Sequence, residues 1–169
     1  MNIALIGFRG TGKTTICRLL ANKLDRKLIS TDEETEKRTK MSIAHLVKKY
    51  GWERFREIEA DVIESISDFD DCVFDTGGGI IMRNENIINL KKNTLVVLLT
   101  ADVKTITNRL KNKKRPALTK SNYLDEIKDV LKEREEMYRK AADYTIDTSR
   151  LAPEEACDLI MHYVQMEMQ

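Results

Sequence analysis

Residues 2–14 read NIALIGFRGTGKT, and this stretch decides the fold. Its second part, residues 7–14, matches the pattern G-x-x-x-x-G-K-[ST] of a phosphate-binding loop. The apolar residues before the loop predict a strand, and apolar residues at Ile16, Leu20 and Leu24 have the spacing of one helix face. A strand, this loop and a helix in that order are the context that the motif requires. The stretch therefore predicts a site for the phosphates of a nucleoside triphosphate, with a chance glycine turn as the weaker alternative.

Each residue type in the loop has a physical task. The glycines allow a tight backbone whose N–H groups point inward at phosphate oxygens, and the following helix adds the positive end of its dipole. The Lys13 ammonium places a charge beside the β- and γ-phosphates, and the Thr14 hydroxyl can ligate Mg²⁺. The candidate nucleotide-binding residues of the loop are Gly10, Thr11, Gly12, Lys13, Thr14 and Thr15. The motif alone leaves the reaction open, because switches, motors and kinases share it.

The composition is typical of one globular domain spanning residues 1–169. The chain has 169 residues, of which 41% are hydrophobic and 34% charged, and its net charge is +1. This length can bury a sizeable core, and this charge balance argues against a protein that grips nucleic acid by bulk charge. No apolar run approaches the roughly 18 residues of a membrane span. We therefore expect neither nucleic acid nor a membrane as a partner. We also expect a monomer whose partner is a small molecule.

The cysteines and the start of the chain indicate a reducing compartment. Cys17, Cys72 and Cys157 are odd in number and far apart, so they lack the short spacings of a zinc site, and they are few for a disulfide framework. The apolar residues 2–6 form a shorter run than the roughly 7–15 residues that a secretory signal needs. We therefore expect free thiols and a cytoplasmic protein.

Short apolar segments alternate with longer segments of helical spacing. The predicted strands are residues 2–6, 27–30, 72–74, 94–99 and 144–146. Their Val, Ile and Leu content is typical of strands buried on both faces of a parallel sheet. The last helical segment follows Pro153, a residue favoured in the first turn of a helix. The alternation predicts an α/β fold with right-handed crossovers.

Two segments interrupt this alternation. Residues 31–67 are long and polar, and they predict several helices packed as an insertion beside the sheet. Residues 111–122 (KNKKRPALTKSN) are basic and contain a proline, so we expect a mobile surface loop there. Arg115 in this loop could close over a transferring phosphate and screen it from water. The alternative is a solvated basic loop, or a weak nucleic-acid patch without the interleaved aromatic residues that stack on bases.

Three further clusters could complete a site, and each has a plainer alternative. Asp32 follows the second predicted strand, where ligands bind in such sheets, and could accept a hydroxyl proton or instead cap the next helix. Arg56 lies one helical turn before Glu59. Glu59 could orient the Arg56 guanidinium to bind a ligand carboxylate, or the two could form an ordinary surface ion pair. Three glycines at residues 77–79 let a ligand approach the backbone closely, or form a flexible turn.

The ordered set of motifs resembles the shikimate kinase family, within the P-loop nucleoside-monophosphate-kinase-like group. The motifs are T-D from residue 31, F-R-x-I-E from 55, G-G-G from 77, R-P-x-L from 115 and R-x-x-x-Y from 134. The resemblance covers about residues 1–155. It implies a three-layer P-loop α/β fold with a five-stranded parallel sheet flanked by helices. It also implies a helical substrate-binding insertion at about residues 32–63 and a mobile lid at about residues 112–122.

The resemblance also implies shikimate as substrate, with ATP and Mg²⁺ as co-substrate and metal. In that family the residue matching Asp32 contacts the shikimate hydroxyls and is the candidate base, and two arginines clamp the carboxylate. The implied catalytic residues are Lys13, Asp32 and Arg115. The implied substrate-binding residues are Asp32, Arg56, Gly77, Gly78, Gly79 and Arg134. The implied nucleotide-binding residues outside the loop are Arg115 and Arg150, and Arg109 is a further candidate beside a position where this chain departs from the family.

The metal-binding acid departs from the family pattern. Ser30 stands where the first aspartate of D-T-D usually helps to hold Mg²⁺ through water. Asp75 stands two residues before the triple glycine, where the family usually has a small residue. We expect both positions to end strands that flank the phosphate loop. The metal site is therefore expected at Thr14 and Asp75.

The adenine contact departs from the pattern as well. Asn108 stands where an arginine commonly packs on adenine. Arg109 is one candidate to replace it, although a shift of one residue on a helix turns the side chain by about 100°. Ser149 and Arg150, after the last predicted strand, are the other candidates.

The sequence leads to the hypothesis of ATP-dependent transfer of a phosphoryl group to the 3-hydroxyl of shikimate. Two arginines suit the carboxylate of this acid, and one aspartate suits its hydroxyls. One rival is another small-molecule kinase on the same scaffold, for a different hydroxy acid or a nucleoside monophosphate. The other rival is a nucleotide-binding regulatory protein without catalysis, to which only Ser30 points.

Overall fold

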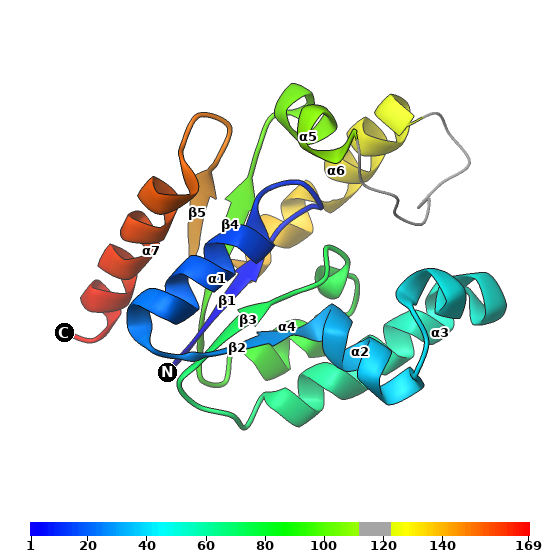
Figure 1. Cartoon of the computed structure of the whole chain (residues 1–169), viewed down its shortest axis with the longest axis horizontal. Helices are drawn as coiled ribbons and strands as arrows, with labels where there is room; N and C mark the ends of the chain where they lie inside the picture. Colours follow the sequence, from blue (N-terminus) through cyan, green and yellow to red (C-terminus); the bar gives the residue numbers. More distant parts are fainter. Residues whose placement is uncertain (112–122) are drawn as a thin grey trace.

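Five parallel strands form one sheet in the order β2-β3-β1-β4-β5 (Figure 1). The structure is a computed structural model that describes residues 1–111 and 123–169. The strands are β1 (Asn2–Ile6), β2 (Lys27–Ser30), β3 (Cys72–Asp75), β4 (Thr94–Thr100) and β5 (Tyr144–Asp147). The five predicted strands are therefore confirmed, and three of them extend one residue further than predicted.

Helices cover both faces of the sheet, so the predicted three-layer α/β fold is confirmed. The helices are α1 (Lys13–Leu24), α2 (Thr31–Thr39), α3 (Ile43–Ile66), η1 (Ile80–Met82), α4 (Asn84–Leu90), α5 (Val103–Leu110), α6 (Tyr123–Ala141) and α7 (Pro153–Glu167). Helices α1 and α7 pack together on one face, while α3, α4 and α6 lie on the other (Figure 1).

Side chains of the central strands alternate between two hydrophobic cores. In β1, Ala4 and Ile6 point into the core beneath α3 and α6, whereas Ile3 and Leu5 point into the core beneath α1 and α7. This alternation with period two explains why the central strands are apolar throughout. The expectation of burial on both faces is wrong for the two edge strands, since Lys27 and Leu28 in β2 and Thr145 in β5 are exposed where no strand lies beyond them.

The predicted helical insertion is confirmed at α2 and α3, which pack against each other. Gly51 adopts φ +84° and divides α3 into two helical parts. A small third core forms there, in which Leu46, Phe55 and Ile58 are buried. This arrangement holds α2 and α3 beside the carboxyl ends of β2 and β3.

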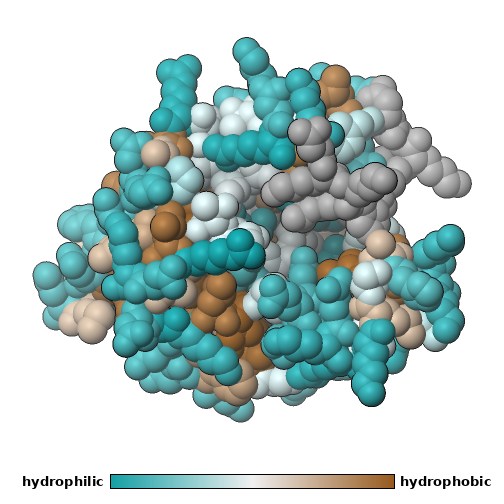
Figure 2. Space-filling model, in the orientation of Figure 1, coloured by the Kyte–Doolittle hydropathy of each residue, from teal (hydrophilic) through white to brown (hydrophobic). Residues whose placement is uncertain are grey.

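The surface agrees with the charged composition. Hydrophilic side chains cover most of the face shown in Figure 2, and hydrophobic ones are exposed in separate smaller areas. Within residues 1–111 and 123–169, no helix is both long and apolar enough to cross a bilayer.

All three cysteines are buried free thiols, as expected. The predicted lid at residues 112–122 lies outside the described residues.

Candidate active site

The phosphate loop joins β1 to α1, and its backbone requires glycine. Gly10 and Gly12 have φ angles of +83° and +99°, which disfavour other residues. A Cβ atom at Gly7 would lie 2.3 Å from the carbonyl oxygen of Leu99 in β4. The loop is therefore packed tightly against the sheet, and the helix that starts at Lys13 points its positive end into the space above.

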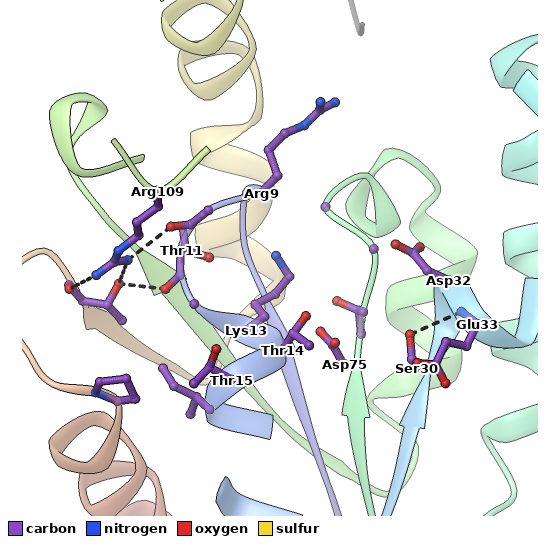
Figure 3. A pocket seen from close by; sticks show the side chains of 18 of the residues that line it. Arg9, Thr11, Lys13, Thr14, Thr15, Ser30, Asp32, Glu33, Asp75 and Arg109 are labelled. Carbon is purple, nitrogen blue, oxygen red and sulfur yellow. Dashed lines mark hydrogen bonds between the residues drawn. The ribbon is translucent and has the colours of Figure 1, made fainter. Parts of the chain in front are cut away.

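The Lys13 ammonium lies inside this loop. Only 8% of the residue is exposed, and its Nζ donates hydrogen bonds to the carbonyl oxygens of Gly7 (2.8 Å) and Phe8 (3.0 Å). The Thr14 and Thr15 side chains are exposed to the same space (Figure 3). The sequence thus places a cation and two hydroxyls where a phosphate-binding loop requires them.

A cavity of about 560 Å³ surrounds the loop, and we call it the phosphate cavity. All six predicted loop residues line it, Gly10 to Thr15, together with Arg9, Ser30, Asp32, Glu33, Asp75, Thr76, Gly77, Gly78, Arg109 and Thr148. Asp75 is the last residue of β3, directly beside β1, and is 8% exposed. The prediction that Ser30 also ends a strand beside the loop is wrong, because β3 lies between β2 and β1.

Arg109 is held at the outer rim of the phosphate cavity. Its guanidinium donates to the Gly10 carbonyl oxygen (3.2 Å) and to both the hydroxyl and the carbonyl oxygen of Thr148 (3.1 and 2.8 Å). The Thr148 hydroxyl donates in turn to the carbonyl oxygen of Thr11 (2.8 Å). Sequence reasoning missed Thr148, although its place directly after β5 is a signal that could have found it.

The two other adenine-side candidates lie elsewhere. The Ser149 hydroxyl donates to Asp147 (2.5 Å) and accepts from the backbone N–H of Asp102 (2.8 Å), so it fixes the turn after β5. Arg150 is exposed and is not among the residues that line the phosphate cavity.

Ser30, and not Asp32, caps helix α2. The Ser30 hydroxyl accepts a hydrogen bond from the backbone N–H of Glu33 (3.3 Å), and the helix begins at Thr31. The alternative that Asp32 is the cap is therefore wrong. Asp32 lies in the first turn, and its carboxylate faces the loop region in Figure 3. The Thr31 hydroxyl accepts from the backbone N–H of Gly77 (2.9 Å), which fixes this turn against the glycines.

A second cavity of about 330 Å³ lies beside the first, and we call it the arginine cavity. It is lined by Phe8, Arg9, Asp32, Glu36, Ser42, Ile43, Ala44, Trp52, Phe55, Arg56, Glu59, Gly77, Gly78, Gly79 and Arg134. The structure thus brings all six predicted substrate-binding residues together, although they come from α2, α3, the loop after β3, and α6.

Arg56 is held rigidly in this cavity. It donates to the Glu59 carboxylate (2.7 Å), and the two side chains are 12% and 1% exposed. Its guanidinium also lies against the rings of Trp52 and Phe55, 5.4 and 4.9 Å from their centroids. The pair is therefore buried, and the alternative of an ordinary surface ion pair is wrong. Burial raises the pKa of Glu59, Arg56 opposes this shift, and the charge of Asp32 adds to it.

Arg134 reaches the same cavity from α6 on the other side of the glycines. It is 8% exposed and donates to the carbonyl oxygen of Gly78 (3.3 Å). The Tyr138 hydroxyl donates to the same oxygen, which explains the spacing R-x-x-x-Y, since these residues lie one turn apart on the helix. Burial raises the pKa of the Tyr138 hydroxyl.

Buried polar atoms in this region lack partners. Within the described part of the chain, Nε of Arg134 and Oε1 of Glu59 are buried without a hydrogen bond. Such groups are costly to leave unpaired unless a ligand or water pairs with them.

The glycines at residues 77–79 leave room for charged side chains. A Cβ atom at Gly79 would lie 1.9 Å from the Arg56 guanidinium, and one at Gly77 would lie 2.7 Å from Glu59 Oε1 and 2.9 Å from Asp32 Oδ1. None of the three has a positive φ. Packing therefore requires glycine at residues 77 and 79, whereas a Cβ atom at Gly78 would have its nearest contact at 3.4 Å, and the alternative of a merely flexible turn is wrong for Gly77 and Gly79.

The two cavities share Arg9, Asp32, Gly77 and Gly78. One holds the lysine and hydroxyls of a phosphate loop, and the other holds two buried arginines. A carboxylate stands where they meet. This arrangement defines the class of P-loop kinases that phosphorylate a small anionic molecule.

Comparisons with known proteins identify the family within this class. A family model described as shikimate kinase matches residues 9–165. The shikimate kinase of Pelotomaculum thermopropionicum is 41% identical over 165 residues, which are 97% of this chain and 95% of that protein. That of Thermodesulfovibrio yellowstonii is 42% identical over 161 residues, which are 95% and 92% of the two chains.

Solved structures agree. A shikimate kinase from Acinetobacter baumannii in complex with shikimate has a TM-score of 0.93 and 34% identity, covering 98% of this chain and 93% of that one. A shikimate kinase from Aquifex aeolicus has a TM-score of 0.82 and 31% identity, covering 99% and 98%. The chain belongs to the shikimate kinase family, as its motifs indicated. Arg115 lies outside the described residues, and the roles of the other site residues remain predictions.

Proposed function

We propose that this chain transfers the γ-phosphoryl group of ATP to the 3-hydroxyl of shikimate, giving shikimate 3-phosphate and ADP for aromatic amino-acid biosynthesis. The observation that carries the proposal is the meeting of the phosphate cavity and the arginine cavity at Asp32. A triphosphate on the loop and an acid in the arginine cavity would have their reacting groups at this junction. Positioning of this kind supplies much of the catalysis in phosphoryl transfer.

The substrate acid is held by charge and shape. Arg56 and Arg134 receive its carboxylate, and Gly77, Gly78 and Gly79 allow the ring to approach the backbone. Asp32 orients the 3-hydroxyl and accepts its proton as the new P–O bond forms, while the bond to ADP breaks. A ligand that lacked the carboxylate or hydroxyls would leave these buried groups unpaired, which gives the site its specificity.

The nucleotide is held by the loop residues Gly10 to Thr15, with Lys13 stabilising the transferred group and Arg109 at the rim. Arg115 and Arg150 are the other predicted nucleotide contacts, although Arg150 does not line the phosphate cavity. Mg²⁺ neutralises charge on the β- and γ-phosphates when bound. The oxygen donors at Thr14 and Asp75 fit this hard cation, which takes oxygen ligands from few side chains together with phosphates. We further propose that the enzyme acts as a monomer in the cytoplasm.

The experiment is a coupled assay of ADP release with shikimate, other hydroxy acids and nucleoside monophosphates as acceptors. We expect shikimate-dependent release that falls at least about 1,000-fold in Asp32→Ala, since this residue serves the transition state and general-base contributions reach about 10²–10⁴-fold. Nucleotide binding should persist in this variant. Release that requires a different acceptor, or full activity in Asp32→Ala, would overturn the proposal.

A further inference from the structure

Asp75 presents its carboxylate to the phosphate cavity. It is 8% exposed, and no hydrogen bond or ion pair to its side chain is present among residues 1–111 and 123–169. Its oxygens are not among the fully buried, unpartnered polar atoms of the described residues, so the carboxylate is open to the phosphate cavity. The side chain points into the phosphate cavity, toward the space between Thr14 and Asp32 (Figure 3). A ligand in that cavity can therefore reach the carboxylate oxygens.

The position of Asp75 favours a cation as the ligand of its carboxylate. Asp75 ends β3, which pairs directly with the strand that leads into the phosphate loop, at the register of Leu5. An anionic nucleotide beside it would add repulsion unless a cation stood between them. The exposed Thr14 hydroxyl on the first turn of α1 supplies a second oxygen donor at the same place.

The neighbouring strand cannot supply this charge. Ser30 is the register partner of Asp75 on β2, one strand further from the loop, and its hydroxyl is neutral and caps α2. Glu33 lines the phosphate cavity but is exposed. Among the described carboxylates of this cavity, Asp75 is the one that combines burial with a place on the strand next to the loop.

We propose that Asp75, together with the Thr14 hydroxyl, holds the Mg²⁺ of the bound nucleotide. This chain thereby carries the metal-binding carboxylate at the end of β3, while a serine ends β2. The inference rests on the proposed function only in requiring a nucleotide on the loop. The acid substrate plays no part in it.

The test compares Asp75→Asn with wild type, using Mn²⁺ as a spectroscopic substitute for Mg²⁺. The affinity of Mn²⁺ for the protein saturated with β,γ-imido-ATP is measured from the electron paramagnetic resonance signal of free Mn²⁺. We expect Asp75→Asn to weaken Mn²⁺ binding about 10- to 100-fold, the range for loss of a group that supports a metal ligand. The matched control is Glu33→Gln, which removes a carboxylate from the same cavity and should leave the affinity within twofold of wild type.

Two further readouts separate metal binding from a structural role. In EDTA, Asp75→Asn should bind the nucleotide as tightly as wild type or more tightly, because a negative charge near the phosphates is gone. Its melting temperature without ligands should not fall, because the Asp75 side chain makes no hydrogen bond or ion pair within the described residues that asparagine would lose.

Unchanged Mn²⁺ affinity in Asp75→Asn would overturn the proposal. Weaker nucleotide binding in EDTA, or a lower melting temperature, would also overturn it, because either would show that Asp75 supports the loop itself. A chain that binds metal and nucleotide as expected but phosphorylates none of the acceptors would instead overturn the proposed function alone.

Discussion

Because Gly79 has no side chain, the Arg56 guanidinium can occupy the space beside its Cα atom. A Cβ there would lie 1.9 Å from Nη2, whereas a Cβ at neighbouring Gly78 would find its nearest contact at 3.4 Å. Sequence reasoning predicted that the glycine run admits a ligand. It could not predict that two of the glycines admit charged side chains of the protein, because that depends on how α3 packs against β3.

The alanine variants of these glycines should therefore differ. Gly79→Ala must displace Arg56, so we expect the KM for shikimate to rise at least about 10-fold, since charge-assisted hydrogen bonds contribute about 1.5–3 kcal/mol. The affinity for ATP should be little changed. Gly78→Ala, with its nearest contact at an ordinary distance, should have the smaller effect. Equal effects of the two substitutions on KM would contradict this account of the packing.

The buried pair of Arg56 and Glu59 makes a second prediction at this scale. Arg56→Met should lose shikimate binding and also destabilise the fold by about 3–5 kcal/mol, because Glu59 is left charged and buried. Arg56→Met with Glu59→Gln should regain most of that stability and none of the binding. Denaturant unfolding and shikimate titration measure the two effects separately. Recovery of substrate binding in the double variant would show that Arg56 has only a structural role.

The pH dependence of Arg56→Met follows from the same burial. Burial already raises the pKa of Glu59, and loss of Arg56 removes the main influence that lowers it. A carboxyl group with a raised pKa in the folded state lowers stability as pH rises through the window from its unfolded pKa, about 4.3, to the folded value. The loss in free energy of unfolding of Arg56→Met relative to wild type should therefore be larger at pH 8 than at pH 5. A deficit that is independent of pH would mean that Glu59 does not remain buried.

At the scale of elements, the cap of α2 connects the fold to the chemistry. Ser30 ends β2 and caps α2, so Asp32 follows the strand after a single residue and has a fixed direction. The periodicity of apolar residues predicted α1, and the length and polarity of residues 31–67 predicted the helices α2 and α3. These patterns could not assign the cap, because S-T-D offers several capping residues and only the backbone geometry decides between them.

Ser30→Ala should destabilise the protein by about 1 kcal/mol, the usual cost of losing a capping hydroxyl. Turnover should fall as well, because the first turn of α2 carries Asp32. Ser30→Thr keeps a hydroxyl and serves as the matched control, with stability and turnover close to wild type. Chemical denaturation and the coupled assay provide the two measurements. Loss of turnover in Ser30→Thr equal to that in Ser30→Ala would contradict the capping role.

At the scale of the whole molecule, the sheet order decides which residues meet. The alternation of strands and helices predicted a parallel sheet, and the family resemblance predicted five strands. The order β2-β3-β1-β4-β5 places β3 beside the loop, which corrects the expectation that Ser30 lies there too. Strand order depends on contacts between distant segments, so local patterns carry little of it. For the same reason Thr148, which arrives from β5, escaped prediction.

The central claim is that one carboxylate joins a nucleotide site to an acid site. The most direct test is to incubate the wild-type enzyme with ATP, Mg²⁺ and shikimate and to assign the product by phosphorus–proton correlation NMR. We predict a single phosphate ester at the 3-hydroxyl, formed in equal amount with ADP. Release of inorganic phosphate with shikimate unchanged, or a phosphate ester at another hydroxyl, would contradict the account.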